Sequence, residues 1–530
     1  MLTDLTAKAN AGDPHAEAEL VDAFSGRLRF GTAGLRGPLG PGPNRMNRVV
    51  VTQTAAGLAA YLRQQGLAGG RVLIGFDARH KSDVFAADTA EVMAGAGFDP
   101  LLTSAPIPTP VIAFGIRQLG CVAAVVVTAS HNPPRDNGYK VYLGDGCQIV
   151  DPVDRRIAEQ IETATRQPLS AIPRSATYTV LGDELVQAYL DRVAALVPAS
   201  APRRVSWVYT PLHGVGAEVV ARAVRGAGFG QPSMVAEQAQ PDATFPTVAF
   251  PNPEEPGALD LALTQAVAEN VDLVVANDPD ADRCAAAVPI DGRWRMLRGD
   301  ELGSLLADDA LRRGMRGTYA CSIVSSALLA KMAAAYGQPF ACTLTGFKWI
   351  ARVPGLVFGY EEALGFCVDP AAVADKDGIS ALLRVLALAA ELKSAGLSLA
   401  DRLDEVARSY GVHETDQLSV RVTDLGIIAD AMSRLRAQPP SSLVGDPVEV
   451  LDLAAGSADL PPTDAVRLVG ERLSVVVRPS GTEPKLKCYL EARMPPALSA
   501  DLVAARRQAR DLLQRARTEI ASALGQPSTT

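Results

Sequence analysis

The feature that most constrains the fold is a repeated alternation of short apolar runs with alanine- and leucine-rich stretches of helical pattern. The apolar runs predict strands at 71–76, 121–127, 205–209, 271–276, 319–324 and 473–477. The helical patterns predict helices at 52–64, 84–95, 259–269, 325–336, 379–392 and 502–524. The run 121–127 consists only of small or apolar residues, which is typical of a strand buried on both faces, as in parallel sheets between layers of helices. The alternation therefore predicts an α/β fold with mainly parallel sheets.

The length of the chain predicts several domains. With 530 residues it is too long for one hydrophobic core, and about three or four domains are expected. A linker rich in Pro, Ala, Ser and Arg lies at 197–204, and further boundaries are expected near 293–299 and 410–414. We therefore expect domains at 1–198, 199–298, 299–412 and 413–530.

Composition excludes several classes of partner. A formal charge of −8 and an aromatic content of 5% argue against a nucleic-acid partner. The sequence predicts no membrane span and no signal peptide, because it lacks a long uncharged apolar run and a basic, apolar leader. Seven scattered cysteines without a Cys-x-x-Cys pair indicate reduced thiols and no cysteine-based metal site. We therefore expect a cytoplasmic protein.

A candidate nucleophile follows the apolar run 122–127. The motif Thr-Ala-Ser-His-Asn-Pro-Pro occupies 128–134, and ligands of open α/β sheets collect at the carboxyl ends of such strands. Ser130, carried on a stiff loop, is therefore a candidate nucleophile. A turn serine that caps the next element explains this motif equally well when it is taken alone. We do not expect His131 to act as the base for Ser130, because adjacent loop residues usually point apart.

A candidate metal site follows the apolar run 271–276. Asp278, Asp280 and Asp282 alternate along the chain, and a hard divalent cation relieves the repulsion among three such carboxylates. Oxygen-only ligands favour Mg²⁺. An EF-hand is excluded because Arg283 and Pro289 stand where that loop needs Gly and Glu. The haloacid-dehalogenase phosphatases are excluded because Asp282 replaces their Thr. A solvated acidic turn is the remaining structural alternative.

A candidate phosphate site follows the apolar run 473–477. The segment Arg-Pro-Ser-Gly-Thr-Glu-Pro-Lys-Leu-Lys at 478–487 combines a guanidinium, two hydroxyls, a glycine and two lysines, which suit a dianionic phosphate. A basic hairpin turn is the alternative. Two weaker signals are the glycine-rich loop 30–37, which contains Arg36, and the acidic pair in 359–365, a pattern that commonly binds sugar hydroxyls. An ordinary turn explains each of these two equally well.

The combination is more specific than its parts. A serine, a magnesium loop and a separate phosphate clamp indicate phosphoryl transfer through a phosphoserine. The metal would bridge an oxygen of the phosphoserine and neutralise the charge that develops during transfer. A serine hydrolase is disfavoured because the chain contains no Gly-x-Ser-x-Gly elbow.

In these loops the chain resembles the α-D-phosphohexomutase superfamily, the phosphoglucomutases and phosphomannomutases. The motifs Thr-Ala-Ser-His-Asn-Pro, Asp-Pro-Asp-Ala-Asp-Arg, Glu-Glu-Ala-Leu-Gly and Arg-Pro-Ser-Gly-Thr occur in the family's order, and the resemblance spans nearly the full length. The opening loop 30–37 with 42–47 looks most like the branch of phosphoglucomutase-2-type enzymes. That branch includes phosphopentomutases and a glucose-1,6-bisphosphate synthase.

The resemblance implies a four-domain, heart-shaped architecture, with three related α/β domains and a smaller C-terminal α+β domain. It also implies one Mg²⁺ per chain and a sugar 1,6-bisphosphate as activator. The residues carried over by position are, for the metal, Ser130 with Asp278, Asp280 and Asp282; beside these ligands, as a substrate-binding residue, Arg283; around the phosphoserine, Arg36, His131 and Lys140; as an acid or base, Lys376; for the sugar, Thr345, Gly346, Glu361 and Ala363; and for the non-reacting phosphate, Arg478, Ser480, Gly481, Thr482 and Lys487.

The implied activity is a mutase that interconverts a hexose 1-phosphate and its 6-phosphate, with glucose or mannose as the sugar, through a phosphoserine and a bisphosphate intermediate. Ala363 departs from the family pattern, because many glucose- and mannose-using relatives have Ser there. The lost hydrogen bond is worth about 1 kcal/mol. A phosphopentomutase acting on ribose or deoxyribose 1-phosphate, or a bisphosphate synthase, is therefore the alternative. The acid or base stays open among His131, Lys140 and Lys376, and the oligomeric state between monomer and dimer.

Two further alternatives come from other classes. A magnesium phosphomonoesterase using the same serine would release inorganic phosphate instead of an isomer. A sugar-phosphate-binding protein on a mutase scaffold would need damage to one of the core loops, and none is visible in the sequence.

Overall fold

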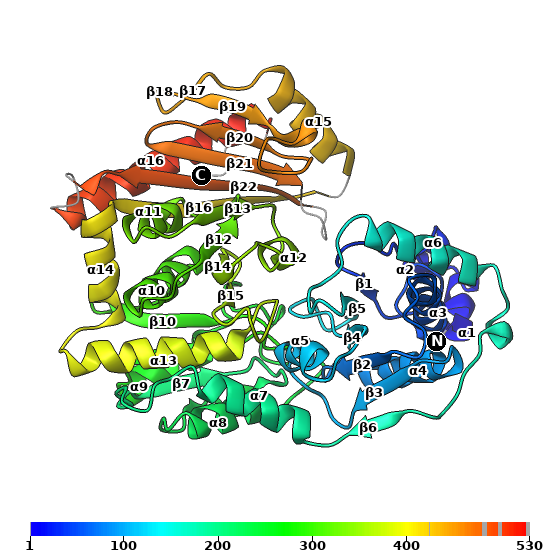
Figure 1. The fold of residues 1–530 in the computed structure, drawn as a ribbon. Helices are drawn as coiled ribbons and strands as arrows, with labels where there is room; N and C mark the ends of the chain where they lie inside the picture. Colours follow the sequence, from blue (N-terminus) through cyan, green and yellow to red (C-terminus); the bar gives the residue numbers. More distant parts are fainter. Residues whose placement is uncertain (1, 423–424, 480–484, 497–500, 526–530) are drawn as a thin grey trace. The chain divides into compact units, whose positions relative to one another are not determined.

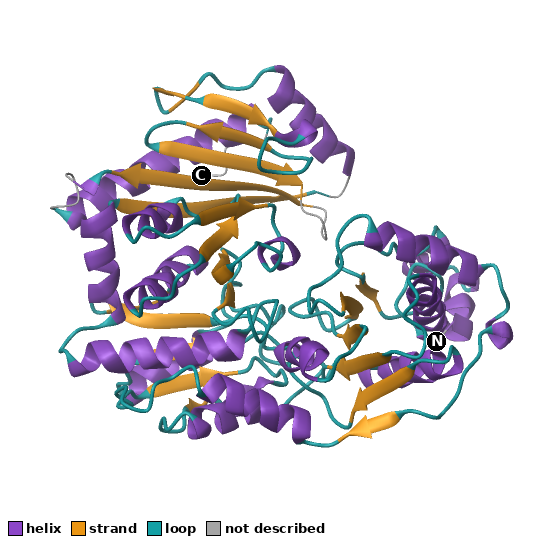
Figure 2. Cartoon of the chain, in the orientation of Figure 1, coloured by secondary structure: helices purple, strands orange, loops and turns teal. Residues whose placement is uncertain are grey.

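A computed structural model describes residues 2–422, 425–479, 485–496 and 501–525. The chain forms two compact units, one of Met1–Leu297 with Leu364–Ala395 and the other of Arg298–Ala363 with Gly396–Thr530. Each unit combines sheets with flanking helices (Figures 1 and 2). Among the helices that the structure describes, none is both long and apolar enough to cross a membrane.

The first sheet of the first unit is mixed. Its strand order is β1 (Leu35–Pro38), β5 (Asp136–Leu143), β4 (Ala123–Val127), β2 (Arg71–Phe76), β3 (Asp99–Thr103) and β6 (Thr179–Leu181). The central strands β4, β2, β3 and β6 are parallel, whereas β5 and β1 are antiparallel additions at one edge. The parallel strands therefore end at a common edge of the sheet.

Both faces of β2 are covered by helices, as its residues after Arg71, all apolar or glycine, predict. Val72 and Ile74 belong to a core shared with α3 (Arg48–Gln64) and α4 (Ser82–Gly95). The alternate residues Leu73 and Gly75 lie against α5 (Thr109–Gln118), which is on the opposite side of the sheet (Figure 1).

The second sheet of the first unit has the order β11 (Arg293–Met296), β10 (Ala285–Ile290), β9 (Leu273–Ala276), β7 (Trp207–Thr210) and β8 (Ser233–Met234). Strands β9, β7 and β8 are parallel. β7 and β9 begin two residues later than the sequence pattern predicts. The reason is a turn-like contact before them, because the Asp272 carboxylate accepts hydrogen bonds from the backbone N–H and the hydroxyl of Ser206.

A later segment of the chain returns to the first unit. It contains β15 (Gly365–Cys367) and α13 (Gly378–Ser394). Asp377 caps α13 by accepting from the N–H groups of Ile379 and Ser380, and it also accepts from the Tyr189 hydroxyl at 2.8 Å. This segment carries Lys376 into the same unit as Ser130.

In the second unit, β12 (Thr318–Ser322) lies parallel to both β13 (Phe340–Thr343) and β14 (Leu356–Glu361). The helix predicted at 325–336 begins only at Leu328, as α11 (Leu328–Ala335). The turn before it is held by carboxylates, because the N–H groups of Ser326 and Ala327 donate to Asp300 and Glu491 respectively.

The other sheet of the second unit is antiparallel, in the order β16 (Val412–Arg421), β22 (Lys485–Met494), β21 (Leu473–Pro479), β20 (Val466–Val469) and β19 (Glu449–Asp452). Val475 and Val477 of β21 share a core with α16 (Leu502–Ala523) and α15 (Leu425–Ala437). Val476 packs from the opposite face against Ile323 and Leu344. This alternation explains the apolar run 473–477, since both faces of β21 are covered.

Candidate active site

Ser130 lies directly after β4, where the sequence pattern places it. Its backbone adopts a left-handed conformation with φ 52°, which non-glycine residues seldom adopt. The side chain is 1% exposed, and Oγ donates a hydrogen bond to Asp278 Oδ2 at 2.8 Å. The candidate nucleophile and the candidate metal loop therefore meet, although they follow strands of different sheets.

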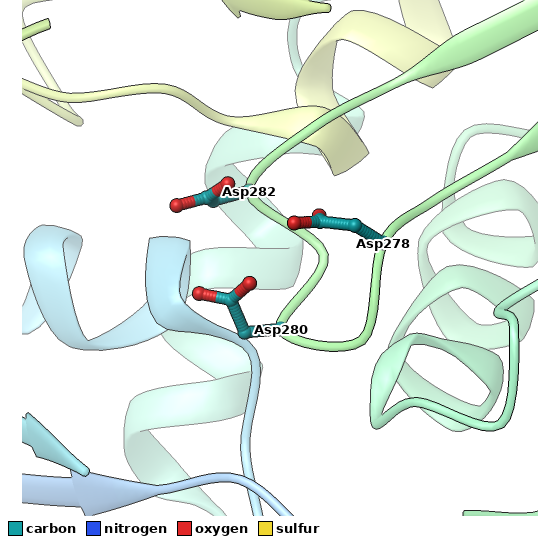
Figure 3. A group of neighbouring side chains, drawn as sticks. All are labelled: Asp278, Asp280 and Asp282. Carbon is teal, nitrogen blue, oxygen red and sulfur yellow. The ribbon is translucent and has the colours of Figure 1, made fainter. Parts of the chain in front are cut away.

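The aspartate triad (Asp278, Asp280 and Asp282) lies on the loop after β9. Each of the three carboxylates offers a ligand atom, and these atoms all lie within 4.8 Å of one another. Figure 3 shows the three side chains directed toward a common space. Ala281, between two of them, has φ 54°, so the loop makes a tight left-handed turn that brings alternate carboxylates together.

Cationic side chains contact the triad, and two of them, Lys140 and Lys376, are buried. Lys140 Nζ donates to Asp280 Oδ2 and to Asp282 Oδ2, each at 2.7 Å. Lys376 Nζ lies 3.3 Å from Asp282 Oδ2. Arg283 Nη1 lies 3.2 Å from Asp278 Oδ2 and 3.0 Å from Ser130 Oγ. The site thus combines three carboxylates with several fixed positive charges, the balance that a phosphorylated serine and a divalent cation require.

The carboxylates of the triad titrate differently. Burial raises the pKa of Asp278 to about 7, and the two neighbouring carboxylates act in the same direction. Burial is the largest influence on Asp280 and Asp282 as well and opposes their ionisation. Lys140, together with Thr109 for Asp280 and with Lys376 and Arg283 for Asp282, nevertheless holds the pKa of both below the usual value. In turn these two carboxylates overcome the burial of Lys140 and raise the pKa of its ammonium. At neutral pH, Lys140 is therefore charged and paired.

The triad passes a test of fit for a hard divalent cation. Oδ1 of Asp280 and Oδ1 of Asp282 are buried and have no hydrogen-bond partner in the part of the chain that the structure describes. Arg283 Nη1 lies 3.8 Å from Asp282 Oδ1, too far for a hydrogen bond, so both oxygens have room for a further donor or a cation. The three oxygen donors suit Mg²⁺ rather than a soft metal.

The expectation that the side chains of Ser130 and His131 point apart is wrong. His131 Nδ1 lies 3.2 Å from Ser130 Oγ, so the two adjacent side chains point toward each other and not apart. The reason is the left-handed backbone of Ser130, which breaks the extended geometry in which successive side chains alternate. Burial, with Arg283 and Arg36, lowers the pKa of His131 well below its usual value. The imidazole is therefore neutral, and its Nδ1 also faces Arg283 Nη1 at 2.6 Å.

Arg36 reaches the same loop from β1. Its Nη1 donates to Asn132 Oδ1 at 3.1 Å, while its Nε is buried without a hydrogen-bond partner among the described residues. Burial, together with the nearby Arg283, lowers its pKa. A guanidinium with a spare, buried donor at the loop that carries a nucleophilic serine suits a phosphate oxygen.

Close packing joins the returning segment to the metal loop. A Cβ on Gly378 would collide with the backbone carbonyls of Arg283 and Ala281, so only glycine permits this approach. Asp375 receives hydrogen bonds from Tyr142 and Gln148, each at 2.7 Å. These contacts fix the segment on either side of Lys376.

The predicted sugar-binding residues lie in the second unit. Thr345 and Gly346 follow the end of β13, and Glu361 is the last residue of β14. Because both strands run parallel to β12, these residues lie at one edge of the sheet. Ala363 follows two positions after Glu361.

Of the predicted phosphate clamp, Arg478 and Lys487 are opposite each other on β21 and β22. Lys487 Nζ lies 5.9 Å from the centre of the Tyr489 ring. Ser480, Gly481 and Thr482 lie outside the described residues.

Sequence reasoning missed several residues that support the site. Thr109 begins α5, and its hydroxyl donates to Asp280 Oδ2 at 2.6 Å. Asp77 and Arg79 follow β2 at the same sheet edge as the Ser130 loop. A polar pair after a predicted parallel strand was the available signal for Asp77 and Arg79, whereas a lone Thr109 between prolines gives none.

Models of known families match all four parts of the chain. The phosphoglucomutase/phosphomannomutase alpha/beta/alpha domains I, II and III match residues 27–168, 187–290 and 298–410, and the C-terminal domain matches 418–509.

Individual proteins are similar over most of their length. A probable phosphomannomutase from Haemophilus influenzae is 47% identical, across 87% of this chain and 96% of that protein. A probable phosphoribomutase from Schizosaccharomyces pombe is 37% identical, across 90% of this chain and 89% of that protein. A solved phosphoglucomutase/phosphomannomutase family protein from Burkholderia thailandensis shares the fold, with a TM-score of 0.69 at 20% identity, over 90% of this chain and 95% of that one.

Proposed function

Because the chain belongs to the phosphoglucomutase/phosphomannomutase family and is a phosphosugar mutase, we propose that it interconverts a hexose 1-phosphate and the hexose 6-phosphate, with glucose or mannose as the sugar. Ser130 carries the phosphoryl group between them. The 47% identity to a probable phosphomannomutase supports a hexose substrate. Seven free cysteines are in keeping with a reducing compartment, and we place the reaction in the cytoplasm.

The observation that carries the proposal is the hydrogen bond from Ser130 Oγ to Asp278, beside the cations Arg283 and Lys140. In the first half-reaction the bond from phosphorus to Ser130 Oγ breaks and a bond to the free sugar hydroxyl forms. The proton of that hydroxyl passes to a base. The bisphosphate then turns end for end. The bond from its other phosphorus to the sugar oxygen breaks as the bond to Ser130 Oγ forms again, and that sugar oxygen takes up the proton.

The residues around Ser130 have different roles in this transfer. Arg283 and Arg36 supply donors to the phosphoryl oxygens, and Lys140 keeps its positive charge because its pKa is raised. The aspartate triad, with an oxygen on Ser130, would hold Mg²⁺, one per chain. When bound, the metal supplies positive charge against the charge that develops on the transferred group. The proton is handled by His131, Lys140 or Lys376.

The second unit supplies recognition of the sugar and of its fixed phosphate. Glu361, Thr345 and Gly346, at the carboxyl edge of the β12–β14 sheet, bind sugar hydroxyls. The non-reacting phosphate is held by Arg478, Ser480, Gly481, Thr482 and Lys487. A trace of sugar 1,6-bisphosphate activates the enzyme by phosphorylating Ser130.

The test is conversion of glucose 1-phosphate or mannose 1-phosphate to the 6-phosphate, with Mg²⁺ and a trace of the 1,6-bisphosphate. We expect isomer to accumulate, with intact mass showing one added phosphoryl group on the wild-type chain and none on Ser130→Ala. Release of inorganic phosphate without isomer would instead identify a phosphomonoesterase.

A pentose substrate is the second candidate, favoured by Ala363 and by the similarity to a phosphoribomutase. Comparing kcat/KM for glucose, mannose, ribose and deoxyribose 1-phosphates separates the two. We expect the hexoses to give the larger values; larger values for the pentoses would assign a phosphopentomutase. Accumulation of free bisphosphate would point to a bisphosphate synthase.

A further inference from the structure

The carboxyl end of β2 carries a buried polar pair that the proposed mechanism does not use. Asp77 is 2% exposed and Arg79 is 4% exposed, and their side chains lie 3.5 Å apart, from Oδ2 to Nε. A buried ion pair is a weak source of stability by itself, because desolvation offsets much of the attraction. Its contacts indicate another role.

The guanidinium of Arg79 binds the loop that carries Ser130. It donates to a set of backbone carbonyls in that loop: Ser130 at 2.6 Å, Asn132 at 2.5 Å, Pro133 at 2.8 Å and Asp136 at 3.2 Å. The planar fork of arginine can reach several acceptors at fixed angles, which an ammonium cannot do. One side chain thus fixes the path of the loop from residue 130 to residue 136.

Asp77 fixes the backbone N–H of Ser130, through Thr128. Its Oδ2 accepts a hydrogen bond from Thr128 Oγ1 at 2.6 Å, and Thr128 Oγ1 accepts one from the Ser130 N–H at 2.8 Å. Asp77 Oδ1 is fixed by the hydroxyl of Ser82 and the N–H of Arg79. Both backbone groups of Ser130 are therefore tied to the end of β2, the N–H through Thr128 and the C=O through Arg79.

These hydrogen bonds act on a residue whose backbone is strained. A non-glycine residue at φ 52° is in a sparsely populated conformation and needs neighbours that hold it there. If the backbone of Ser130 relaxed, Oγ would leave Asp278. Phosphoryl transfer depends mainly on positioning, and a displacement of about 1 Å can lower the rate about 100-fold.

We propose that Asp77, Arg79 and Thr128 are positioning residues that hold Ser130 in the left-handed conformation from which Oγ reaches the transferred phosphoryl group. This inference rests on the proposed role of Ser130 as the phosphoryl carrier. Their hydrogen bonds go to backbone groups of the Ser130 loop and to one another, so we expect them to act on the rate of transfer and not on sugar binding.

The first test uses Thr128, where volume can be kept constant. Thr128→Val removes the acceptor of the Ser130 N–H, whereas Thr128→Ser keeps it. We expect Thr128→Val to slow both kcat and the transfer of phosphoryl from glucose 1,6-bisphosphate to Ser130, followed by intact mass, by about 100-fold, with KM little changed. Thr128→Ser should restore most of the rate. If valine prevents folding, Asp77→Asn has the same expected outcome.

The second test separates geometry from charge and from stability. Arg79→Lys keeps the charge but loses the fork, and we expect the same loss of kcat with unchanged KM. Arg203 is a matched control, because it too donates to several carbonyls, including Ala227 at 2.7 Å and Pro198 at 2.8 Å. It also lies over an aromatic ring, Phe229 at 5.1 Å, as Arg79 lies over Phe245 at 4.8 Å. Arg203→Lys should lower the melting temperature without lowering kcat.

The outcomes distinguish failure of the proposed function from failure of the positioning role. A wild-type chain that takes no phosphoryl group on Ser130 would overturn the proposed function and the positioning role with it. A phosphorylated wild-type chain, with Thr128→Val and Arg79→Lys as fast as wild type, would overturn the positioning role alone. Loss in Arg79→Lys matched by an equal loss in Arg203→Lys would show that only stability had changed, and would also overturn it.

Discussion

Ser130 Oγ and Asp278 Oδ2 lie 2.8 Å apart, although 148 positions separate the two residues along the chain. Ser130 lies on the loop after one parallel strand of the first sheet, and Asp278 follows a parallel strand of the second. The contact is therefore made by the carboxyl ends of strands from different domains, where α/β proteins place their ligands.

Ser130→Ala should abolish turnover without unfolding the protein. The change removes the oxygen that forms the bond to phosphorus, so kcat should fall by at least about 10,000-fold, as for other nucleophiles that act within a catalytic unit. Steady-state kinetics and a melting curve check this. Ser304→Ala is a matched control, since Ser304 is a buried serine whose hydroxyl bonds only a helix carbonyl in the contacts described, that of Asp300. Equal activity of the two variants would contradict the role of Ser130.

Thr109→Val should weaken magnesium binding. The Thr109 hydroxyl orients Asp280 through a hydrogen bond of 2.6 Å, and loss of such an outer contact typically lowers metal affinity about 10- to 100-fold. Thr109→Ser should retain most of the affinity. Titration of activity with Mg²⁺ after removal of metal by a chelator, and calorimetric binding of Mg²⁺, both measure the effect. Identical Mg²⁺ dependence in all three proteins would exclude this role.

Gly378→Ala should disturb the metal loop. The added Cβ would meet the carbonyls of Arg283 and Ala281, and overpacking of this kind costs about 1–3 kcal/mol. Because the shift falls on the loop of the triad, kcat should drop together with the melting temperature. A Cβ on Gly230 meets nothing within 4 Å, so Gly230→Ala is the control and should change neither. If Gly378→Ala left kcat and the melting temperature unchanged, the metal loop would have to accommodate the added Cβ without cost.

Asp300→Asn should flatten the pH dependence of stability. Burial raises the pKa of Asp300 from 3.8 to about 7, with like charges on Glu362 and Glu491 adding to it. Because its pKa is higher in the folded state, the stability it contributes is complete below the unfolded pKa and is lost as pH rises through about 7. The slope is at most about 1.4 kcal/mol per pH unit.

Asparagine can keep the hydrogen bonds from Ser326 and Tyr360 without the titration. Melting temperatures of both proteins between about pH 5 and pH 8 provide the comparison. We expect the wild-type curve to fall relative to that of Asp300→Asn as pH rises. Parallel curves would mean that Asp300 titrates at its ordinary pKa.

Much of the fold could be predicted from the apolar runs. The strand predicted at 71–76 is confirmed with the same bounds as β2, because its apolar residues serve two faces. The boundaries near 325 could not be predicted, since Ser326 and Ala327 are held by carboxylates on Asp300 and Glu491, which are distant in sequence.

The site shows the same division. The serine motif and the aspartate triad are each a short stretch of sequence, so the residue types within each stretch predict its chemistry. The contact of His131 with Ser130 was not foreseen, because it depends on the φ of Ser130 and not on residue type. Thr109 carries no signal of its own, and its role follows only from where α5 begins.

The returning segment 364–395 has a consequence for how the chain can be divided. The polypeptide passes between the two units at 297/298, at 363/364 and again at 395/396. A fragment ending at Leu297 would therefore encode the whole aspartate triad but neither Lys376 nor α13. If the gene were split at residue 297, the second fragment would have to supply segment 364–395 to the unit formed by the first fragment. Activity recovered by mixing the two fragments would show that this segment had been supplied.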